Sequence, residues 1–352
     1  MSTMRTIFLL LISAPLWAQE LPFEGFVPAP APEEGLRACF YNVENLFDTQ
    51  DDSLTLDEEF TPESDKNWTP SRYWDKQRNL AKTLLAVGYE QPPAIIGLCE
   101  VENRGVLEDL TQQDLMQVHN YRIVHFESTD RRGIDVGLLL QRDQVELLSA
   151  SFIRLVREED PEWRTRDILY AKVRTTQWSD TLHLFVNHWP SRRGGEEASR
   201  PLRVLAAQAL KLRVDSVLAH RPNQGVVIMG DLNDGVGDAS LVQGLKAAPT
   251  YSDTAVLVDG MAALDHDWGT HKYRGEWAYL DHFVLSANLL GGKSRSRAGD
   301  VEIFKAQFLL KPDDRYTGFY PLRTYSGPRY LGGFSDHLPI YVDLFPTATS
   351  TR

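Results

Sequence analysis

Cysteine is scarce in this chain of 352 residues, which contains only two. A disulfide scaffold or a thiolate-rich zinc cluster needs more, so both classes of protein are excluded. Positive charge is also in short supply, because 37 Lys and Arg residues face 49 Asp and Glu residues and leave a net charge of −12. That balance argues against a protein that holds nucleic acid by bulk charge alone. It is compatible with an enzyme that contacts a few phosphates through a bound cation.

Long hydrophobic runs are missing as well, except close to the N-terminus. Residues 1–18 carry Arg5 ahead of an apolar run at 7–12, which is typical of an export signal cleaved after Ala18. A buried N-terminal strand or helix is the alternative. The run is too short to span a bilayer, and no later run is long and apolar enough to do so. We therefore expect a secreted or periplasmic protein without stable membrane insertion.

The rest of the chain has the composition of a single folded domain. Hydrophobic residues make up 42% and charged residues 24%, which excludes disordered, collagenous and coiled-coil chains. Residues 19–36 contain four prolines between positions 22 and 32 and predict a stiff, extended lead-in. No obvious repeat or long Gly/Ser linker follows, so residues 37–345 are interpreted as one domain and residues 346–352 as a tail. We expect a monomer that needs no obligate protein partner.

Short runs rich in Val, Ile and Phe recur along the domain and predict strands. They lie at residues 38–41, 94–99, 136–140, 182–186, 226–229, 283–285 and 340–344. Apolar residues at helical spacing predict helices at 74–87, 103–115 and 196–219. The irregular alternation of the two kinds of element favours mixed sheets covered by helices over a strictly parallel barrel. The acidic stretch 48–59 and the segment 259–276 are interpreted as loops.

Polar side chains collect where these predicted strands begin or end. Antiparallel neighbours place the start of one strand beside the end of the next, so these side chains can meet at one edge of the structure. Each of them alone is more typical of a turn or a helix cap, but so many in one chain favour a site. The set comprises Asn42, Glu100, His188, Asp231, Asn233, Asp281, Asp336 and His337.

The residue types in this set suit the hydrolysis of phosphoesters. Carboxylates and carboxamides are hard oxygen ligands, which bind Mg²⁺, Mn²⁺ or Ca²⁺. His188 and His337 can each act as a base, an acid or a donor to a phosphate. In such a reaction the cation neutralises phosphate oxygens, a base activates water, and donors stabilise the charge that develops on phosphorus.

Seven motifs give the sequence its most specific signal. They are YNVENLFD at 41–48, GLCEVEN at 97–103, RGIDV at 132–136, VNHWPS at 186–191, GDLND at 230–234, LDHF at 280–283 and SDHLP at 335–339. In their order and spread, over residues 37–345, the chain resembles the endonuclease/exonuclease/phosphatase superfamily. That resemblance implies an α/β fold: a four-layered α-β-β-α sandwich of two mixed sheets, as in DNase I-like proteins.

The resemblance also implies which residues hold a metal. Glu100 would be the principal ligand, with Asn42 beside it, and Asp336 would complete the surroundings of the metal and its water. The implied cofactor is Mg²⁺, with Mn²⁺ or Ca²⁺ as alternatives. Asp135 would either brace His188 from a neighbouring strand or be a turn residue.

For the reaction itself, the resemblance implies that His337 is the general base or a phosphate contact, oriented by Asp281. Asp231 would activate water or protonate the leaving group. Asn233 and His188 would contact the phosphate, with His188 as the first of the family's two histidines.

Two further segments have both a functional and a structural interpretation. Arg192, Arg193, Arg200 and Arg203 follow His188 and could meet phosphate, although arginines beside an amphipathic helix are mostly solvated. The segment 272–277 resembles a hairpin at the mouth of the site in exported relatives, although packing could also account for its aromatic residues.

The sequence thus predicts an exported, divalent-metal-dependent phosphoesterase that uses activated water and forms no covalent intermediate. A nuclease or phosphodiesterase acting on DNA or RNA is the first choice of substrate class. A phosphatase of nucleotides or sugar phosphates is the second, and a phospholipid head-group esterase the third. A silent ligand-binding module of the same fold is the non-enzymatic alternative, and it would be expected to lack one or more of the residues of the site.

Overall fold

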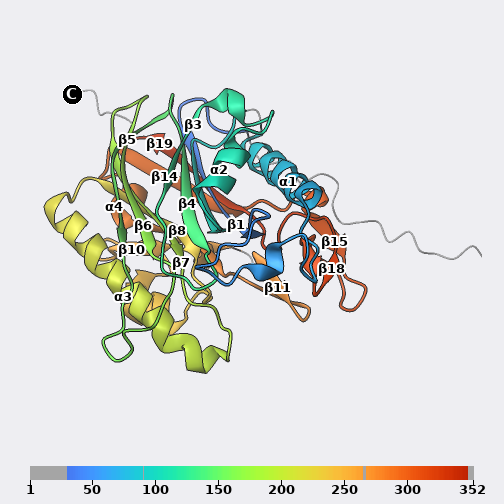
Figure 1. The fold of residues 1–352 in the computed structure, drawn as a ribbon. Helices are drawn as coiled ribbons and strands as arrows, with labels where there is room; N and C mark the ends of the chain where they lie inside the picture. The colour runs from blue at the N-terminus through green and yellow to red at the C-terminus, as the bar shows by residue number, and fades with distance from the viewer. Residues whose placement is uncertain (1–29, 90, 265–266, 348–352) are drawn as a thin grey trace, which may run out of the picture.

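The computed structural model describes residues 30–89, 91–264 and 267–347. The predicted export signal at 1–18 lies outside the described residues, as do most of the lead-in and most of the tail. Within the described residues the chain forms two large β-sheets that face each other, with helices on their outer sides (Figure 1).

The first sheet contains six strands, and its central pair is parallel while the other pairs are antiparallel. In order across the sheet the strands are β14 (Ser296–Ile303), β19 (Ile340–Pro346), β1 (Leu36–Leu46), β2 (Ile95–Val101), β4 (Asp135–Gln141) and β3 (Tyr121–His125). The parallel pair β1–β2 is the innermost part of this sheet. A sheet of this mixed kind is what the sequence predicts.

The second sheet contains seven strands and is also mixed, with β7 and β8 parallel at its centre and β10 and β9 parallel at one edge. In order the strands are β5 (Val145–Ile153), β6 (Ile168–Thr175), β7 (Thr181–His188), β8 (Gly225–Asp231), β13 (Asp281–Ser286), β10 (Leu257–Asp259) and β9 (Ala247–Ala248). All seven predicted strand runs are confirmed, and they lie in these two sheets.

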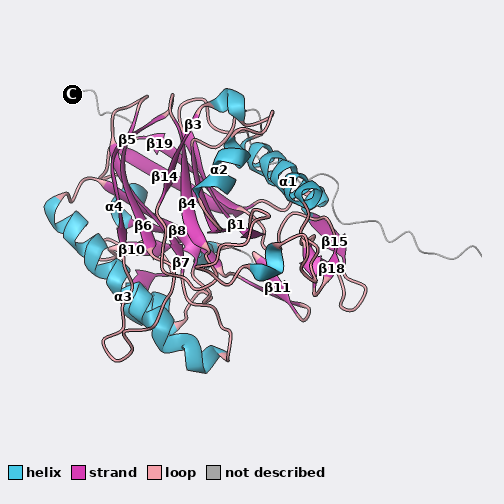
Figure 2. Cartoon of the chain, viewed as in Figure 1, coloured by secondary structure: helices cyan, strands magenta, loops and turns pink. Residues whose placement is uncertain are grey.

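Helices cover both outer faces of the sandwich, as Figure 2 shows. The helices α1 (Pro70–Gly88) and α2 (Arg104–Thr111) lie on the side of the first sheet, and α3 (Glu196–His220) lies on the side of the second. The four-layered sandwich is therefore the observed fold. No helix of the described residues is long and apolar enough to cross a membrane.

Local chemistry explains where α1 begins. Thr69 accepts a hydrogen bond from the backbone N–H of Arg72, and Pro70 occupies the first helical position, where its missing N–H costs nothing. Leu80 and Leu84 are fully buried in the core. The predicted helix at 74–87 is thus right but one turn too short at its start.

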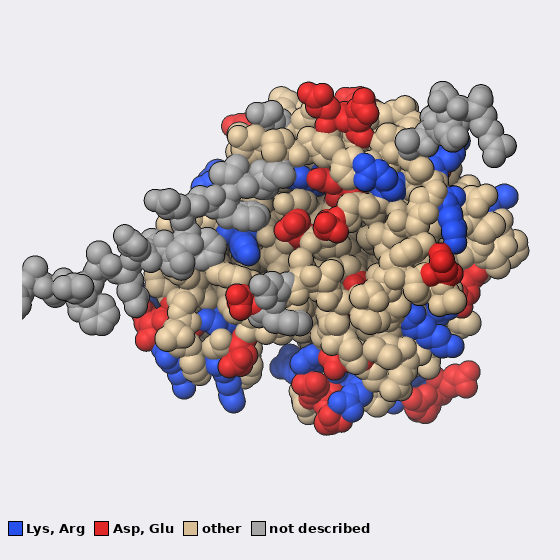
Figure 3. Space-filling model, turned by 180° about the vertical axis from the view of Figure 1, so that it is seen from behind, with Lys and Arg blue, Asp and Glu red and all other residues tan. Residues whose placement is uncertain are grey.

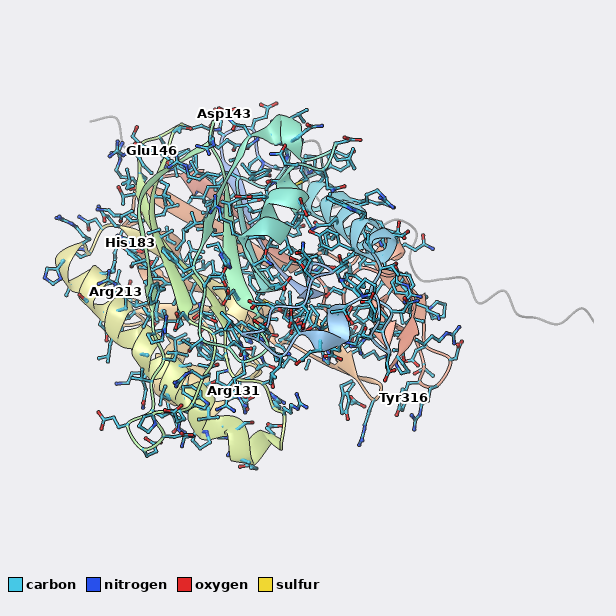
Figure 4. The ribbon with its side chains drawn as sticks, in the orientation of Figure 1. Arg131, Asp143, Glu146, His183, Arg213 and Tyr316 are labelled. Atoms are coloured by element: carbon cyan, nitrogen blue, oxygen red, sulfur yellow. The ribbon has the colours of Figure 1, made fainter. Side chains whose placement is uncertain are left out.

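Polar side chains contact one another between α3 and the second sheet. The Tyr170 hydroxyl on β6 lies 2.8 Å from Nδ1 of His183 on β7, and the Arg213 guanidinium lies 4.8 Å from the centre of the Tyr170 ring. In Figure 4, His183 and Arg213 are neighbours at the interface between sheet and helix. Because Gln224 also hydrogen-bonds the other ring nitrogen of His183, this histidine is fully satisfied and structural.

Short elements complete the chain between the main ones. The small helices are η1 (Glu58–Phe60), η2 (Gln117–His119), η3 (Ser240–Leu245), η4 (Gly260–Ala263), α4 (Ala287–Leu290) and η5 (Gln307–Leu309). The hairpins are β11 (His271–Tyr273) with β12 (Glu276–Ala278), β15 (Leu310–Pro312) with β16 (Phe319–Pro321), and β17 (Tyr325–Ser326) with β18 (Arg329–Tyr330). The loop predicted at 259–276 is therefore wrong in part, because η4 and the β11–β12 hairpin lie in that region.

Both cysteines are free thiols in the first sheet. Cys39 on β1 pairs with Ile96 of β2, whereas Cys99 on β2 pairs with Asn42 of β1, so the two thiols are offset along the strands. Burial raises the pKa of both thiols well above the ordinary value. They are therefore inert core residues.

The two sheets approach each other closely at Gly97 on β2. A Cβ atom there would lie 2.5 Å from the sulfur of Met229 on β8 and 3.2 Å from the ring of Phe40 on β1. Gly97 therefore allows the inner faces of the sheets to pack without a gap.

Replacing Gly97 with Val should lower the free energy of unfolding by roughly 1–3 kcal/mol, because extra methyl groups would overpack the space between the sheets. Denaturant unfolding of purified protein would measure the loss. Combining Gly97→Val with Met229→Ala should recover part of it, since the second change removes the contacting sulfur. Losses that simply add would contradict this account.

Candidate active site

Three of the predicted site residues form a row across the second sheet. His188, the last residue of β7, pairs with Asp231, the last residue of β8, and Asp281, the first residue of β13, pairs with Asp231 from the other side. Residues that lie opposite each other on neighbouring strands point to the same face. The register therefore gathers one imidazole and two carboxylates at one end of the sheet.

A hydrogen bond links this row to the first sheet. Asn42 Nδ2 on β1 donates to Asp231 Oδ2 over 3.0 Å, and both residues are buried. Asp231 Oδ1 accepts a second bond from the backbone N–H of Asn233, whose φ is +52°. Burial raises the pKa of Asp231 to about 7, and the neighbouring Asp281 carboxylate acts in the same direction. Asp231 is thus a fixed carboxylate that can exchange a proton near neutral pH.

His337 stands against Asp281 as the sequence predicted. Its Nδ1 lies 2.6 Å from Asp281 Oδ2, and its Nε2 lies 3.9 Å from Asp231 Oδ2. Burial alone would lower the pKa of His337, but the charge of Asp281 and the hydrogen bond to it raise that pKa well above its ordinary value. Asp281 fixes the ring with Nδ1, so Nε2 is the nitrogen available to a substrate.

His188 has the opposite electrostatic environment. Burial lowers its pKa well below the ordinary value, and the nearby guanidinium groups of Arg166 and Arg132 add to this effect. Its Nε2 lies 3.9 Å from both Asp231 Oδ2 and Glu100 Oε1. The surroundings of the two histidines therefore act in opposite directions: burial favours the neutral form of His188, whereas Asp281 favours the charged form of His337.

Glu100 projects from an irregularity in the first sheet. On β2, Cys99 pairs with Val136 and Val101 pairs with Asp135, so Glu100 is an extra residue at a β-bulge. Its φ of +62° is rare for a residue with a side chain. Such strain collects at functional sites, and the backbone N–H of Asn45 holds Glu100 Oε2 at 2.9 Å.

The brace predicted for His188 is not present. Asp135 instead accepts a hydrogen bond from the backbone N–H of Ser128, and it lies beside His125, with 3.2 Å between Asp135 Oδ2 and His125 Nε2. Nδ1 of His188 has no hydrogen-bond partner among the described residues. The alternative interpretation of Asp135, as a residue that organises a turn, agrees better with these contacts.

Asp336 belongs to a buried network that the sequence did not reveal. Arg323 donates to Asp336 Oδ2 at 2.8 Å and to Glu44 Oε1 at 3.1 Å, and Glu44 also accepts from the backbone N–H of Thr324. Burial raises the pKa of Glu44 to about 6 and lowers that of Lys76, which lies nearby, to about 8. Glu44 stood inside the first motif, but nothing local marked Arg323 as its partner.

The arginines after His188 have separate roles. Arg192 donates to the backbone carbonyl of Asn233 at 2.8 Å and so holds the loop after β8. Arg203 is fully buried on α3 and pairs with Asp234 at 2.6 Å, while Arg200 pairs with Glu197. Arg203 and Arg200 thus form ion pairs with carboxylates within the protein, which agrees with the structural interpretation of these arginines.

His282, next to Asp281, faces the other side of the sheet. Its Nδ1 lies 3.1 Å from both oxygens of Asp259, and its Nε2 lies 2.9 Å from the backbone carbonyl of Asp234. Since acceptors face both nitrogens, both must carry a proton, and the ring is an imidazolium. Burial opposes this charge, but Asp259 prevails and raises the pKa of His282 to about 9. The ring ties the loop that follows Asp231 to β13.

The donor set of this site fits a hard divalent cation. Glu100 uses only Oε2 in the hydrogen bond to Asn45, and Asp336 uses only Oδ2 in its bond to Arg323, which leaves one oxygen on each for a cation. Asp281 Oδ1 is buried without a hydrogen-bond partner among the described residues. Atoms of Asp231, Asp281 and His337 also lie within 4.8 Å of one another. An oxygen-rich set of this kind suits Mg²⁺ or Mn²⁺.

Comparison with known proteins agrees with this geometry. A family model described as "Endonuclease/Exonuclease/phosphatase family" matches residues 37–345. A search of the curated proteins finds no match to the sequence.

Solved structures of similar fold cover 88% of the chain. One is D. rerio TDP2 complexed with a single-strand DNA product, with 18% identity, a TM-score of 0.54 and 98% of that chain covered. Another is the human Nocturnin catalytic domain with a bound sulfate anion, with 14% identity, a TM-score of 0.54 and 93% covered. A family protein from Bacteroides thetaiotaomicron has 13% identity, a TM-score of 0.55 and 94% covered. At these identities the likeness shows a shared fold.

The His282–Asp259 pair should make the stability of the protein depend on pH. Because the pKa of His282 is about 9 in the folded protein and near 6.5 when unfolded, its stabilisation is full below pH 6.5 and is lost between pH 6.5 and 9. The loss should be a few kcal/mol, since one pKa unit corresponds to about 1.4 kcal/mol. Asp259→Asn should be less stable at pH 6 and should flatten this part of the curve in denaturant unfolding. An unchanged slope in Asp259→Asn would show that His282 is not charged.

Proposed function

Because the chain belongs to the endonuclease/exonuclease/phosphatase family, we propose that it is a divalent-metal-dependent phosphoesterase that hydrolyses P–O bonds with activated water. The observation that carries this proposal is the buried Asp281–His337 pair, 2.6 Å apart, with Asp231 at 3.9 Å from the other nitrogen of the ring. A silent binding module would not need this combination of a charged imidazole and a carboxylate that titrates near neutral pH.

His337 and His188 are the groups that would bind the phosphate. The cationic ring of His337 presents Nε2 as a charge-assisted donor, which suits an anionic phosphate oxygen. The neutral ring of His188 presents Nε2 from the opposite side of Asp231. Asn233 is oriented by its bond to the Trp189 carbonyl and would complete the phosphate contacts. Donors on two sides can stabilise the charge that develops during attack.

Asp231 is the group that would move the proton. Its two oxygens accept bonds from Asn42 and Asn233, so its position is fixed before substrate arrives. A carboxyl with a pKa near 7 can take a proton from water or return one to the leaving group. The metal, Mg²⁺ in our proposal, would be held by Glu100 with Asn42 and Asp336, and it supplies charge neutralisation when bound.

A nuclease or phosphodiesterase is our first candidate for the substrate class. One protein of similar fold was crystallised with a single-strand DNA product and another with sulfate, a tetrahedral anion like phosphate. On the face shown in Figure 3, Lys and Arg side chains alternate with Asp and Glu, and no continuous basic surface crosses its described residues. On this face a nucleic acid would therefore be held at a few phosphates and not by bulk charge.

A phosphatase of nucleotides or sugar phosphates is the second candidate, and one feature favours it. A groove of about 750 Å³ adjoins Glu44 and Arg323 and is also lined by Glu58, Glu59 and Asp65. Four carboxylates of its lining outnumber the two cations, Lys66 and Arg323, and would disfavour the next phosphate of a polynucleotide on this side. A small neutral group attached to a single phosphate would fit better there. Because residues 1–18 are predicted to be an export signal, we also propose that the protein acts outside the cytoplasm.

The substrate class can be tested with purified mature protein and a panel of phosphoesters. Single-stranded DNA, RNA, bis-p-nitrophenyl phosphate, p-nitrophenyl phosphate, a mononucleotide and sphingomyelin would each be offered with Mg²⁺, Mn²⁺ or Ca²⁺. EDTA and Glu100→Ala should both abolish turnover, and Mg²⁺ should restore it only in the first case. Glu108→Ala, which changes an exposed glutamate on α2, is the matched control. Full turnover in EDTA, or in Glu100→Ala, would refute the metal-dependent mechanism.

His337→Ala should reduce turnover by roughly 10²- to 10³-fold, because it removes a charge-assisted donor to the phosphate. Steady-state kinetics would measure the loss, and circular dichroism would check the fold. His220→Ala, at the exposed end of α3, should leave turnover unchanged. A reduction of less than tenfold in His337→Ala would reject a catalytic role for His337.

A further inference from the structure

We propose that His125, Glu127 and Asp135 form a second cation site, which binds a divalent transition-metal ion of the zinc type. This site shares no residue with the candidate active site. It lies where β3 ends and β4 begins, at the two ends of the loop formed by residues 126–134.

His125 gives the first indication of a ligand. Its side chain is only 3% exposed, yet Nε2 is buried and has no hydrogen-bond partner among the described residues. A buried imidazole in this state needs an explanation, because buried polar groups are nearly always satisfied.

The distance from His125 to Asp135 supplies that explanation. Nε2 lies 3.2 Å from Asp135 Oδ2 but outside hydrogen-bond geometry. Two ligands bound about 2.1 Å from one tetrahedral ion lie about 3.4 Å apart, and neither points at the other. The arrangement of His125 Nε2 and Asp135 Oδ2 therefore fits two ligands of one ion better than it fits a hydrogen bond.

Glu127 completes a set of three ligands. One ligand atom from each of His125, Glu127 and Asp135 lies within 4.8 Å of the other two. Asp135 is 3% exposed and oriented by the N–H of Ser128, whereas the Glu127 side chain is 69% exposed. An ion could thus enter from the Glu127 side and keep a water molecule as its fourth ligand.

The chemistry of these ligands selects the class of ion. Two carboxylates and one imidazole suit Zn²⁺ or Mn²⁺, whereas Ca²⁺ prefers oxygen ligands alone. Two carboxylates converge on one histidine, so a dication would also neutralise charges that otherwise repel each other.

The strand register explains why these residues meet. His125 pairs with Gly137, and Asp135 lies two residues before Gly137, so both side chains point to the same face of the sheet. Glu127 is two residues after His125 and continues on that side. An ion here would therefore link the two ends of the loop formed by residues 126–134.

The loop in question reaches the active site through a chain of contacts. Asp130 within it pairs with Arg166 at 3.1 Å, and Arg166 donates to the backbone carbonyls of His188 and Trp189 at 3.2 and 2.6 Å. Arg131, also in the loop, is labelled at the lower end of the sheets in Figure 4. An ion that links the two ends of the loop would restrain Asp130 and, through Arg166, the end of β7 that carries His188.

Metal content separates this site from the catalytic one. Chelator-stripped full-length Glu100→Ala protein, which lacks the principal ligand proposed for the active site, would be titrated with Zn²⁺ by isothermal calorimetry. Because Asp231, Asp281 and His337 remain and can also hold an ion, we expect Glu100→Ala/His125→Ala to bind one equivalent fewer than Glu100→Ala. Glu100→Ala/His220→Ala is the matched histidine control and should bind as many equivalents as Glu100→Ala. No binding by Glu100→Ala, or unchanged binding after loss of His125, would overturn the proposal.

A second variant covers the possibility that His125→Ala does not fold. Glu127→Gln changes an exposed side chain in the same Glu100→Ala background and should weaken Zn²⁺ binding at least tenfold with an unchanged circular dichroism spectrum. Co²⁺ in place of Zn²⁺ should give the visible absorption of a four-coordinate ion, and Glu127→Gln should diminish it. If Glu127→Gln binds Zn²⁺ and Co²⁺ like its parent, Glu127 is not a ligand and the proposed three-residue site is overturned. Neither readout depends on turnover, so failure of the proposed function would leave this test intact.

Discussion

The hydrogen bond from Asn42 to Asp231 is the contact on which the arrangement of the site depends. It spans 3.0 Å and joins β1 of the first sheet to β8 of the second. The register of the second sheet fixes His188 and Asp281 on either side of Asp231, and Asp281 in turn holds His337, which precedes β19 of the first sheet. Each sheet therefore contributes part of the site, and its geometry depends on how the two sheets pack.

Burial determines the electrostatics of this region because it removes water from charged groups at the end of an apolar sandwich. A buried charge is costly unless a partner lies beside it, and the partners here are specific. Asp259 keeps His282 charged, and Asp281 keeps His337 charged, whereas His188 has no such partner on Nδ1 and becomes neutral. The same residue type thus acquires different charges from its neighbours.

Sheet position explains how much of the fold the sequence predicted. The predicted strands are mostly central ones, which are buried on both faces and appear as short apolar runs. The main strands it missed include β3, β5 and β14, which lie at sheet edges and carry polar residues such as Arg122, Ser149 and Arg297. Edge strands need apolar residues on fewer positions, so no continuous run marks them in the sequence.

The sequence by itself determined that carboxylates, carboxamides and histidines stand at strand ends, because strand periodicity and turn chemistry are local properties. The resemblance to the family also implied that Asp281 orients His337. Only the tertiary structure decided that Asp135 faces His125 and not His188, and that Glu44 meets Arg323. Those contacts depend on strand register, on the bulge at Glu100 and on chain segments far apart in sequence, none of which leaves a local pattern.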